Sequence, residues 1–330
     1  MENAGQATFL KHKCHHSNCY LTSNRSLLGN LGYFDTILFS AQEISSGERN
    51  LPNVRAAIQK YVFVANDSAD NYPVCDSFYD QFFNWTWTYK MESSIPYTFF
   101  TVHNIHDENL GSHFRWILNM TPIDTYMKSQ LSSKRKAVAI FLDKCKSRSK
   151  REVYIENLKW QLSKYNLGID VYGNCGKNKC KKKMSGCFWR LKKYYFFYLA
   201  MEDSISPNYI TQEVVYGYEN NAVPVVYGGA QYSKFLPPNS YLNAMQLNEE
   251  MLARAMNDII RNRSLYYDYF RWKNHYIIKA TKTLDPCALC KALNNKNWLT
   301  FRTRNVNFRK WWNAFYKTRC AESSIWRTYN

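Results

Sequence analysis

The sequence has no long hydrophobic run. None of its stretches approaches the roughly 18 apolar residues of a membrane-spanning helix. The start, MENAGQATFLKHK, also has no apolar core of signal-peptide or anchor length. The chain as given is therefore expected to be soluble. If the protein works in the secretory lumen, we expect its targeting segment to be missing from this sequence.

Acidic residues are scarce relative to basic ones. There are 26 Asp and Glu against 44 Lys and Arg in 330 residues, a formal net charge of +18. Such an excess favours a polyanionic partner: nucleic acid, a membrane surface or a phosphate-rich ligand. A solvated basic surface explains the excess of basic residues equally well.

The hydrophobic content of 45% excludes a disordered chain, and the length fits two domains or one large α/β domain.

The signature motifs of several enzyme classes are missing. There is no Gly-x-Gly-x-x-Gly or Walker loop, no Gly-x-Ser-x-Gly elbow and no His-Glu-x-x-His. Because Asp-x-Asp is also absent, a nucleotide-sugar enzyme here would neutralise phosphate with Arg and Lys rather than Mg²⁺. The sequence contains no recognisable nucleic-acid-binding module. The best candidate for a nucleic-acid-binding segment is the tail 304–319, which fits an amphipathic helix packed on the body equally well.

Ten cysteines, an even number in short-spaced groups, favour disulfides and an oxidising compartment. Zinc is the rival interpretation, because HKCHHSNC (12–19) and CALC (287–290) have ligand-like spacing. The short spacings favour the bridges Cys14–Cys19 and Cys175–Cys180, with Cys287 and Cys290 bonded in a carboxyl-terminal cluster, although sequence does not fix the connectivity. Five Asn-x-Ser/Thr sequons, at Asn24, Asn66, Asn84, Asn119 and Asn262, also favour a secretory lumen.

Apolar runs at 36–40 and 61–65 predict strands in the first half, and the irregular stretch 104–135 predicts a connection between domains. From residue 136 strands and helices alternate. Strands are expected at 136–142, 168–173, 194–200 and 222–228. Helices are expected after 151, with Ile155, Leu158, Leu162 and Tyr165 on one face, and at 211–220 and 248–262. This alternation predicts a parallel sheet with ligands at the carboxyl ends of its strands.

A basic loop, DKCKSRSKR (143–151), lies between the first of these strands and the next helix. The amino terminus of that helix would add donors for a diphosphate, so the loop is a candidate phosphate site. The alternative is that the loop is a run of charged residues exposed to solvent, with no bound ligand. The segment 201–229 leaves one strand with Glu202 and Asp203, begins a helix and returns along the next strand to Gly228–Gly229. Its acids and helix start are therefore also expected at the ligand edge of the sheet.

These residues resemble the α1,3/4-fucosyltransferases. The segment YFFYLAMEDS…YITQE…NNAVPVVYGGAQYSKFLPPNSYLN (195–243) is similar to the family pattern Y-K-F-x-L-x-F-E-N-S…Y-[VI]-T-E-K…P-V-V-x-G…P-P-x-S. CHHSNCYLTSNRSLL, YVFVANDSAD, FNWTWTYKMESSIPY, YYDYFRWK and CALCKAL resemble further family motifs in order. The resemblance covers about 14–293 and leaves the tail outside.

The resemblance implies a GT-B-type α/β fold of two Rossmann-like domains with parallel sheets: an acceptor-side domain at 1–125, a GDP-fucose domain at 126–293 and a basic aromatic extension at 294–330. It implies inverting, metal-independent transfer of fucose to GlcNAc of a glycoprotein glycan, in the Golgi lumen, by a protein normally held by a single membrane anchor. No nucleic-acid partner is expected. Asn24 and Asn84 are the expected glycosylation sites.

By motif position Asp67 would be the catalytic base. The implied donor-binding residues are Arg151, Glu202, Asp203, Ser204, Tyr209, Thr211, Gln212, Glu213, Gly228 and Gly229. Two departures from the pattern stand out: the family's Thr-Glu-Lys is here Thr211-Gln212-Glu213, and Asp67 replaces a Glu. A fucosyltransferase-fold protein with weak or lost catalysis, still binding nucleotide or glycan, is therefore the alternative prediction.

Overall fold

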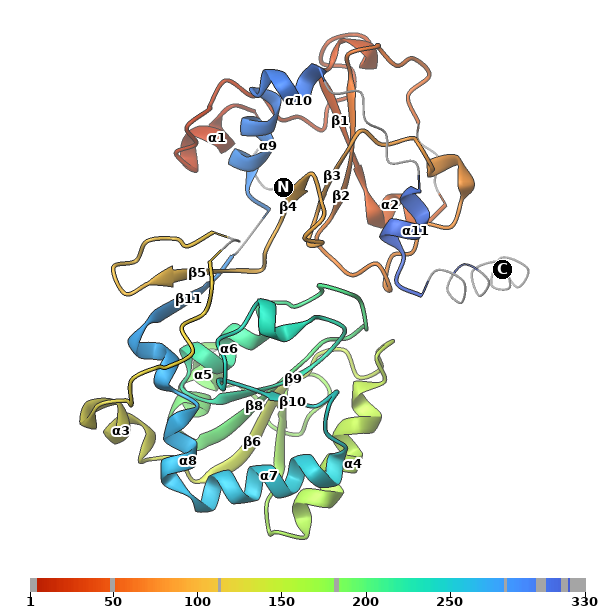
Figure 1. Cartoon of the computed structure of the whole chain (residues 1–330). Coiled ribbons are helices and arrows are strands. Elements are labelled where there is room, and N and C mark those ends of the chain that lie inside the picture. Colours follow the sequence, from red (N-terminus) through yellow and green to blue (C-terminus); the bar gives the residue numbers. More distant parts are fainter. Residues whose placement is uncertain are drawn as a thin grey trace. The chain divides into compact units, whose positions relative to one another are not determined.

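The computed structural model describes residues 5–47, 51–111, 114–180, 184–281, 284–300, 307–315 and 320. The chain forms two compact units. Unit 1 takes in Met1–Tyr97 and Lys282–Asn330, and unit 2 is Thr98–Thr281. Figure 1 labels most of the helices and strands of both units. Each unit is built around its own parallel sheet.

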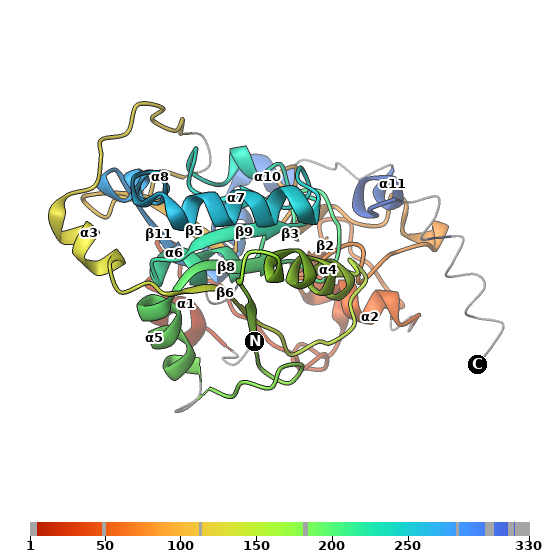
Figure 2. The same ribbon diagram turned by 90° about the horizontal axis from the view of Figure 1, so that it is seen from below.

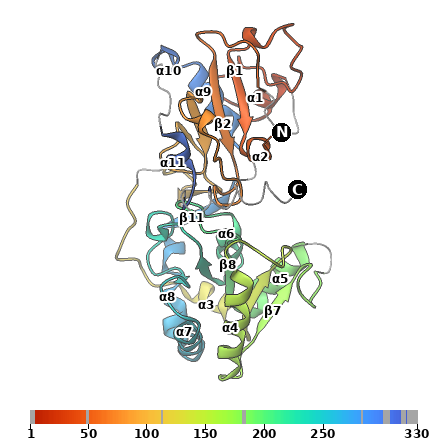
Figure 3. The same cartoon turned by 90° about the vertical axis from the view of Figure 1, so that its right-hand side faces the viewer.

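Unit 1 contains a four-stranded parallel sheet in the order β1-β2-β3-β4. The strands are β1 (Thr36–Ser40), β2 (Lys60–Ala65), β3 (Trp85–Thr88) and β4 (Ile95–Pro96). The helices of this unit are α1 (Ala7–Lys11), α2 (Ala41–Ser45), α9 (Pro286–Leu293), α10 (Lys296–Thr300) and α11 (Phe308–Trp312). Figure 3 shows the strands of the sheet with α2 and α9 beside them.

The core of unit 1 is aromatic. Phe63 of β2 lies 4.8 Å from the ring of Phe308 and 4.7 Å from that of Trp312, centroid to centroid. Both partners come from α11 and are fully buried. This part of the basic tail therefore packs on the body, as the amphipathic-helix interpretation predicted; residues 304–306 and 316–319 lie outside the described residues.

Unit 2 contains a five-stranded parallel sheet in the order β10-β9-β8-β6-β7. Its strands are β6 (Lys136–Phe141), β7 (Ile169–Tyr172), β8 (Tyr195–Met201), β9 (Val223–Tyr227) and β10 (Leu242–Asn243). Its helices are α3 (Thr125–Leu131), α4 (Arg151–Ser163), α5 (Met184–Tyr194), α6 (Glu213–Glu219), α7 (Glu249–Arg261) and α8 (Arg263–Asp268). Every residue of β8 is buried, which fits the central strand of a parallel sheet.

Helices cover both faces of this sheet. Helices α4 and α7 pack together against one face, where Leu158, Leu252 and Met256 join the apolar residues of the strands in one buried cluster. Helix α5 lies on the other side, as Figure 2 shows. There Phe188 of α5 contacts both Phe141 of β6 and Tyr216 of α6. The predicted α/β class with parallel sheets is confirmed, and the strands and helices predicted after residue 136 are present, with α5 as an additional helix between β7 and β8.

The units divide at other residues than the expected boundaries at 125 and 293. Residues 98–125 belong to unit 2, because β5 (Phe100–Asn104) pairs antiparallel with β11 (Tyr276–Ala280). Residues after 281 return to unit 1, where α9 packs against α1 and β4. Among the described residues no helix has the length and apolar character needed to cross a lipid bilayer.

All ten cysteines form disulfides, which overturns the zinc alternative. The expected bridges Cys14–Cys19 and Cys175–Cys180 are wrong, and Cys287 and Cys290 are bonded to partners far along the chain. The bridges are Cys14–Cys287, Cys19–Cys290, Cys75–Cys320, Cys145–Cys175 and Cys180–Cys187. The physical reason is that α9 packs beside the amino-terminal segment, so cysteines separated by more than 270 positions meet.

Candidate donor-binding site

The candidate donor site lies at the carboxyl edge of the unit 2 sheet. Strands β6, β8 and β9 run parallel and end at Phe141, Met201 and Tyr227. The basic loop follows β6, the acids Glu202 and Asp203 follow β8, and the two glycines follow β9. The sequence-predicted residues of this unit therefore gather at one edge, which is where open parallel sheets bind their ligands.

The basic loop is attached to the segment that follows β8. Ser149 donates its hydroxyl to the carbonyl of Glu202 at 2.8 Å and its backbone N–H to that of Asp203 at 3.0 Å. Lys144 bonds the Asp203 carboxylate at 2.7 Å. The Cys145–Cys175 bridge ties the same loop to the end of β7. The loop thus has a defined conformation, which a phosphate site needs and a loose charge run lacks.

Helix α4 begins at this edge with Arg151. Its first turn is closed by Glu152, which accepts from the backbone N–H of Ser147 at 3.3 Å and from its hydroxyl at 2.7 Å. Arg151 donates Nη1 to the carbonyl of Met201. Its Nε is buried and has no hydrogen-bond partner among the described residues. A buried guanidinium N–H without an acceptor is costly, so an anion placed here would satisfy it.

Glu202 is buried beneath the start of α6. Its Oε1 accepts from the backbone N–H of Thr211 at 2.8 Å and from the Thr211 hydroxyl at 3.2 Å. Burial raises the pKa of Glu202 to about 8, assisted by the nearby charges of Glu213 and Asp203 and opposed by the Thr211 hydrogen bonds. At neutral pH the carboxyl group therefore holds its proton in a substantial fraction of molecules.

Glu213, the residue that departs most from the family pattern, is the first residue of α6. Its carboxylate accepts a hydrogen bond from the hydroxyl of Tyr198, a buried residue of β8. Burial raises the pKa of Glu213, while Tyr198 and the positive charge of Arg151 lower it. The preceding residue, Gln212, hydrogen-bonds the side chain of Tyr216. Glu213 thus partly neutralises the arginine expected to bind diphosphate.

The glycines after β9 permit two close approaches. A Cβ on Gly229 would lie 2.6 Å from the backbone oxygen of Ser206, and one on Gly228 would lie 2.7 Å from the hydroxyl of Tyr232. Ser204 and Ser206 are fully buried in the loop between β8 and α6. Tyr209, also buried, packs edge-on against Phe99 at 5.8 Å.

Asp67, the predicted base, belongs to unit 1. It follows β2, and its Oδ1 accepts from the backbone N–H of Ser68 at 2.6 Å and from the amide of Asn71 at 2.9 Å. These bonds orient the carboxylate at the carboxyl end of a parallel strand. The position therefore suits a ligand-facing carboxylate.

The predicted glycosylation sites differ in their surroundings. Asn24 is exposed. Asn84 is half-buried, and its Oδ1 accepts from the backbone N–H of Tyr61 at 2.9 Å and from Arg55 at 2.5 Å. The geometry thus suits a glycan better at Asn24 than at Asn84.

Sequence reasoning missed three residues of this edge. Tyr198 binds Glu213, Ser149 joins the basic loop to Glu202, and Tyr227 donates its hydroxyl to the carbonyl of Ser149 at 3.0 Å. In the sequence the tyrosines are indistinguishable from the apolar residues of β8 and β9, although a buried Tyr hydroxyl requires a partner. That requirement is the feature of the sequence that could have identified the two tyrosines.

In the part of the chain that the structure describes, no group of three or more His, Cys, Asp or Glu side chains could hold a metal ion.

Two family models match the chain. A fucosyltransferase amino-terminal model matches residues 2–100, and a model of the carboxyl-terminal part of glycosyltransferase family 10 (fucosyltransferase) matches residues 131–311, more than half of the chain.

Individual proteins are also similar. Alpha-(1,3)-fucosyltransferase C of Drosophila melanogaster is 29% identical over 89% of this chain and 69% of its own length. Glycoprotein 3-alpha-L-fucosyltransferase A of the same organism is 29% identical over 93% of this chain, which spans only 57% of that protein. A crystal structure of an α1,3-fucosyltransferase with GDP aligns at 14% identity with a TM-score of 0.49, over 82% of this chain and 79% of that one. On the two family models, the chain belongs to glycosyltransferase family 10, the fucosyltransferases.

Proposed function

We propose that the protein is an inverting α1,3-fucosyltransferase that moves fucose from GDP-fucose to GlcNAc of a glycoprotein glycan. The observation that carries this proposal is Arg151, whose buried Nε has no acceptor among the described residues and which opens α4 beside the basic loop. A diphosphate bound there would meet the guanidinium, the loop lysines and the helix amino terminus together. The names of the similar Drosophila proteins give the same transferred sugar and linkage.

The chemistry assigns one role to each unit. Asp67 of unit 1 would remove the proton from the acceptor hydroxyl, whose oxygen then attacks the anomeric carbon of fucose on the face opposite the diphosphate. The bond from that carbon to the diphosphate oxygen breaks, and GDP leaves with the electron pair. Arg151 and the lysines of the basic loop would stabilise the charge that develops on the leaving group, in place of a metal ion.

We also propose that the protein acts in the Golgi lumen, held by a membrane anchor outside the present sequence. Ten cysteines joined in five disulfides support an oxidising compartment. A second candidate function is a protein that binds nucleotide or glycan with weak or lost catalysis. The electrostatic interaction of Glu213 with Arg151 favours it, because a negative charge there opposes diphosphate binding.

A transfer assay with GDP-fucose separates the candidates. Acceptors would be the core GlcNAc of an N-glycan, LacNAc and LacdiNAc, and GDP binding would be measured by calorimetry on the same protein. An active enzyme should lose on the order of 100-fold or more in rate on Asp67→Asn, with GDP affinity unchanged. Asp35→Asn, an exposed carboxylate of the same unit, is the control. GDP binding without transfer supports the second candidate, whereas absence of GDP binding rejects the enzyme and leaves only a glycan-binding form of the second candidate.

A further inference from the structure

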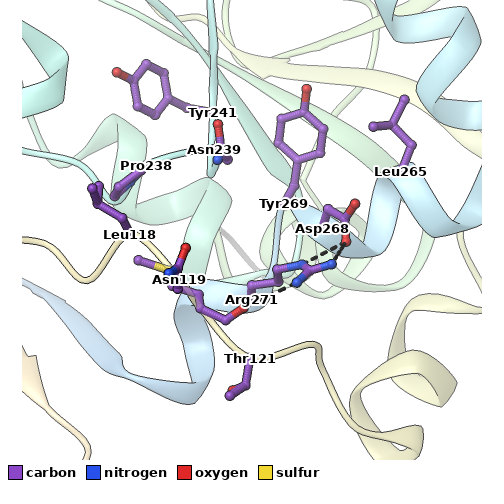
Figure 4. A pocket seen from close by; sticks show the side chains of 11 residues that line it. Leu118, Asn119, Thr121, Pro238, Asn239, Tyr241, Leu265, Asp268, Tyr269 and Arg271 are labelled. Atoms are coloured by element: carbon purple, nitrogen blue, oxygen red, sulfur yellow. Dashed lines mark hydrogen bonds and ion pairs between the residues drawn. The ribbon is translucent and has the colours of Figure 1, made fainter.

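Unit 2 has a second concave site, a cavity of about 560 Å³. Its walls include Asn119, Asn239, Tyr241, Asp268, Tyr269 and Arg271. Figure 4 shows these side chains around the opening. The volume is within the range of ordinary small-ligand pockets, roughly 300–1,000 Å³.

The cavity lies at the opposite edge of the sheet from the donor site. Tyr241 directly precedes β10, which runs parallel to β9, so it is at the amino end of these strands. Helix α8 reaches the same edge, where Tyr266 donates its hydroxyl to the carbonyl of Asn221, at the entrance to β9. None of the donor-site residues lines the cavity.

The walls combine aromatic surface with unused polar groups. The hydroxyls of Tyr241 and Tyr269 and the amides of Asn119 and Asn239 make no side-chain hydrogen bond within the described part of the chain. Asp268 is bound by Arg271 at 2.7 Å, and Arg271 also donates to the carbonyl of Met120 at 3.2 Å. Figure 4 marks the ion pair. The pair fixes a carboxylate and a guanidinium in the wall.

This combination matches a pyranose sugar. A sugar ring has an apolar C–H face and a rim of hydroxyls. A Tyr has an apolar ring and a polar tip. Amide, carboxylate and guanidinium groups supply both acceptors and donors for neighbouring hydroxyls. A purely apolar ligand would leave these polar groups desolvated and unpaired.

The wall also contains a complete glycosylation sequon, Asn119-Met120-Thr121. Asn119 is exposed, whereas the chain on both sides of it is held: Ile117 N–H donates to the Tyr276 hydroxyl at 2.9 Å, and Asn274 donates to the Thr121 hydroxyl at 2.9 Å. A sugar attached to Asn119 would start at the cavity. Short tethers give effective concentrations near the millimolar range, so weak saccharide contacts are enough to fill the site.

We propose that Asn119 carries an N-linked glycan and that its innermost GlcNAc residues occupy this cavity against Tyr241 and Tyr269. In forming the link, the Asn119 amide nitrogen loses a proton and bonds the anomeric carbon of a lipid-diphosphate oligosaccharide, whose lipid diphosphate leaves. The proposal rests on the secretory localisation proposed above. The cavity would then bind a sugar that belongs to the protein itself, and it would be distinct from the site that binds the acceptor glycan.

The first test is site-specific mass spectrometry of the full chain secreted from animal cells behind a signal peptide. We expect a glycan on Asn119. The second test is cleavage of that glycan between its two core GlcNAc residues by an endoglycosidase. Cleavage should be slow on native protein and fast after denaturation, and fast on native Tyr241→Ala/Tyr269→Ala protein. The exposed glycan at Asn24 is the internal control, cleaved at similar rates in all forms.

Thermal unfolding gives an independent readout. Asn119→Gln should lower Tm by about 2–4 °C, and Asn24→Gln should leave it unchanged. An unmodified Asn119 in secreted protein would overturn the proposal. So would equal cleavage of the Asn119 glycan in native and denatured wild type, a comparison that holds even where the tyrosine variants fail to fold.

Two further arms separate the alternatives. If secreted wild type left Asn119 unmodified and its cavity bound free chitobiose, the cavity would take an external saccharide and the attached glycan would be rejected. Fucose transfer is measured separately on the same preparations. Asn119→Gln should transfer fucose at the wild-type rate per folded molecule. A wild type with a protected Asn119 glycan but no transferase activity would reject the proposed enzyme and leave the cavity assignment intact.

Discussion

The carboxylate of Glu213 accepts a hydrogen bond from the hydroxyl of Tyr198; burial raises its pKa, and that bond and the positive charge of Arg151 act against the rise. The residue that replaces the family lysine is therefore held in place from the sheet below, at the cation expected to meet diphosphate. This arrangement predicts weak donor affinity, because bound diphosphate would face a carboxylate as well as an arginine.

Restoring the family residues should tighten GDP binding. Two like charges about 5 Å apart at an effective dielectric of 20 repel by roughly 3 kcal/mol, and a lysine at that position would attract by as much. Solvent and Arg151 screen both effects. We therefore expect Gln212→Glu with Glu213→Lys to lower the Kd for GDP at least tenfold, about 1.4 kcal/mol, and to raise transferase activity.

Calorimetry with GDP measures this change. Glu156→Lys makes the same charge reversal on the exposed surface of α4 and should leave the affinity nearly unchanged. Equal GDP affinity in wild type and double variant would remove the electrostatic argument.

Most of unit 2 could be predicted from its sequence. Its central strands are buried on both faces, so they form continuous apolar runs such as AVAIF and YFFYLA, and helix α7 has a clear apolar face. Helix α5 was not predicted. Its apolar residues Met184, Cys187, Phe188 and Leu191 do recur at helical spacing, but they lie among Gly, Trp and three basic residues, so the stripe was missed. The two-residue strands β4 and β10 are too short to leave a pattern.

The position of the candidate site could also be predicted, since residues after parallel strands share one edge. The contacts within it could not. The partnership of Glu213 with Tyr198 depends on how α6 packs on β8, and the Cys14–Cys287 bridge depends on α9 lying beside the amino-terminal segment. Both pairs are set by tertiary packing, which local spacing does not encode.

The buried carboxyl group of Glu202 should make stability depend on pH. Its folded-state pKa of about 8 lies above the unfolded value near 4.5, so the folded state binds the proton more tightly. The stabilisation from this group is complete below about pH 4.5 and is lost as pH rises towards 8. Glu213 acts in the same direction because burial also raises its pKa.

Buried lysines oppose this trend, because burial lowers the pKa of Lys134 to about 6 and of Lys273 to about 8. The measurable quantity is therefore the difference between wild type and Glu202→Gln in Tm. Relative to the variant, wild type should lose stability as pH is raised from 5 to 8. Glu156→Gln, an exposed change, should track wild type. A difference in Tm between wild type and Glu202→Gln that stays constant over this range would contradict the assignment.

Gly229 should tolerate no side chain. A Cβ there would lie within 2.6–2.8 Å of the backbone O, C and N atoms of Ser206, and a backbone cannot rotate away as a side-chain tip can. Gly229→Ala should destabilise unit 2 by about 1–3 kcal/mol and displace the loop that carries Ser206. Gly168→Ala is the matched control, since a Cβ at that exposed position meets nothing within 4 Å.

Thermal unfolding and GDP binding measured on both variants test this prediction. Both measurements should change in Gly229→Ala and neither in Gly168→Ala. A Gly229→Ala protein with wild-type Tm would show that the approach of Ser206 is not tight in solution.

The bridges Cys14–Cys287 and Cys19–Cys290 should act as one constraint. They join residues 273 and 271 positions apart, so each closes nearly the same loop of the unfolded chain. Removing either bridge leaves that loop closed by the other and should cost little entropy. Removing both opens it, which should cost on the order of 5 kcal/mol. The bridge Cys180–Cys187 spans only 7 positions and should contribute about 2 kcal/mol.

Alanine variants of each cysteine pair, and of all four long-range cysteines together, test this through their unfolding midpoints. Peptide mapping without reduction should first recover the two long-range pairs. The fourfold variant should unfold well below either single-bridge variant, and the loss of Cys180–Cys187 should fall between wild type and that fourfold variant. If each single-bridge variant lost as much stability as the fourfold variant, the two bridges would be acting on local packing around α9 rather than on a shared loop.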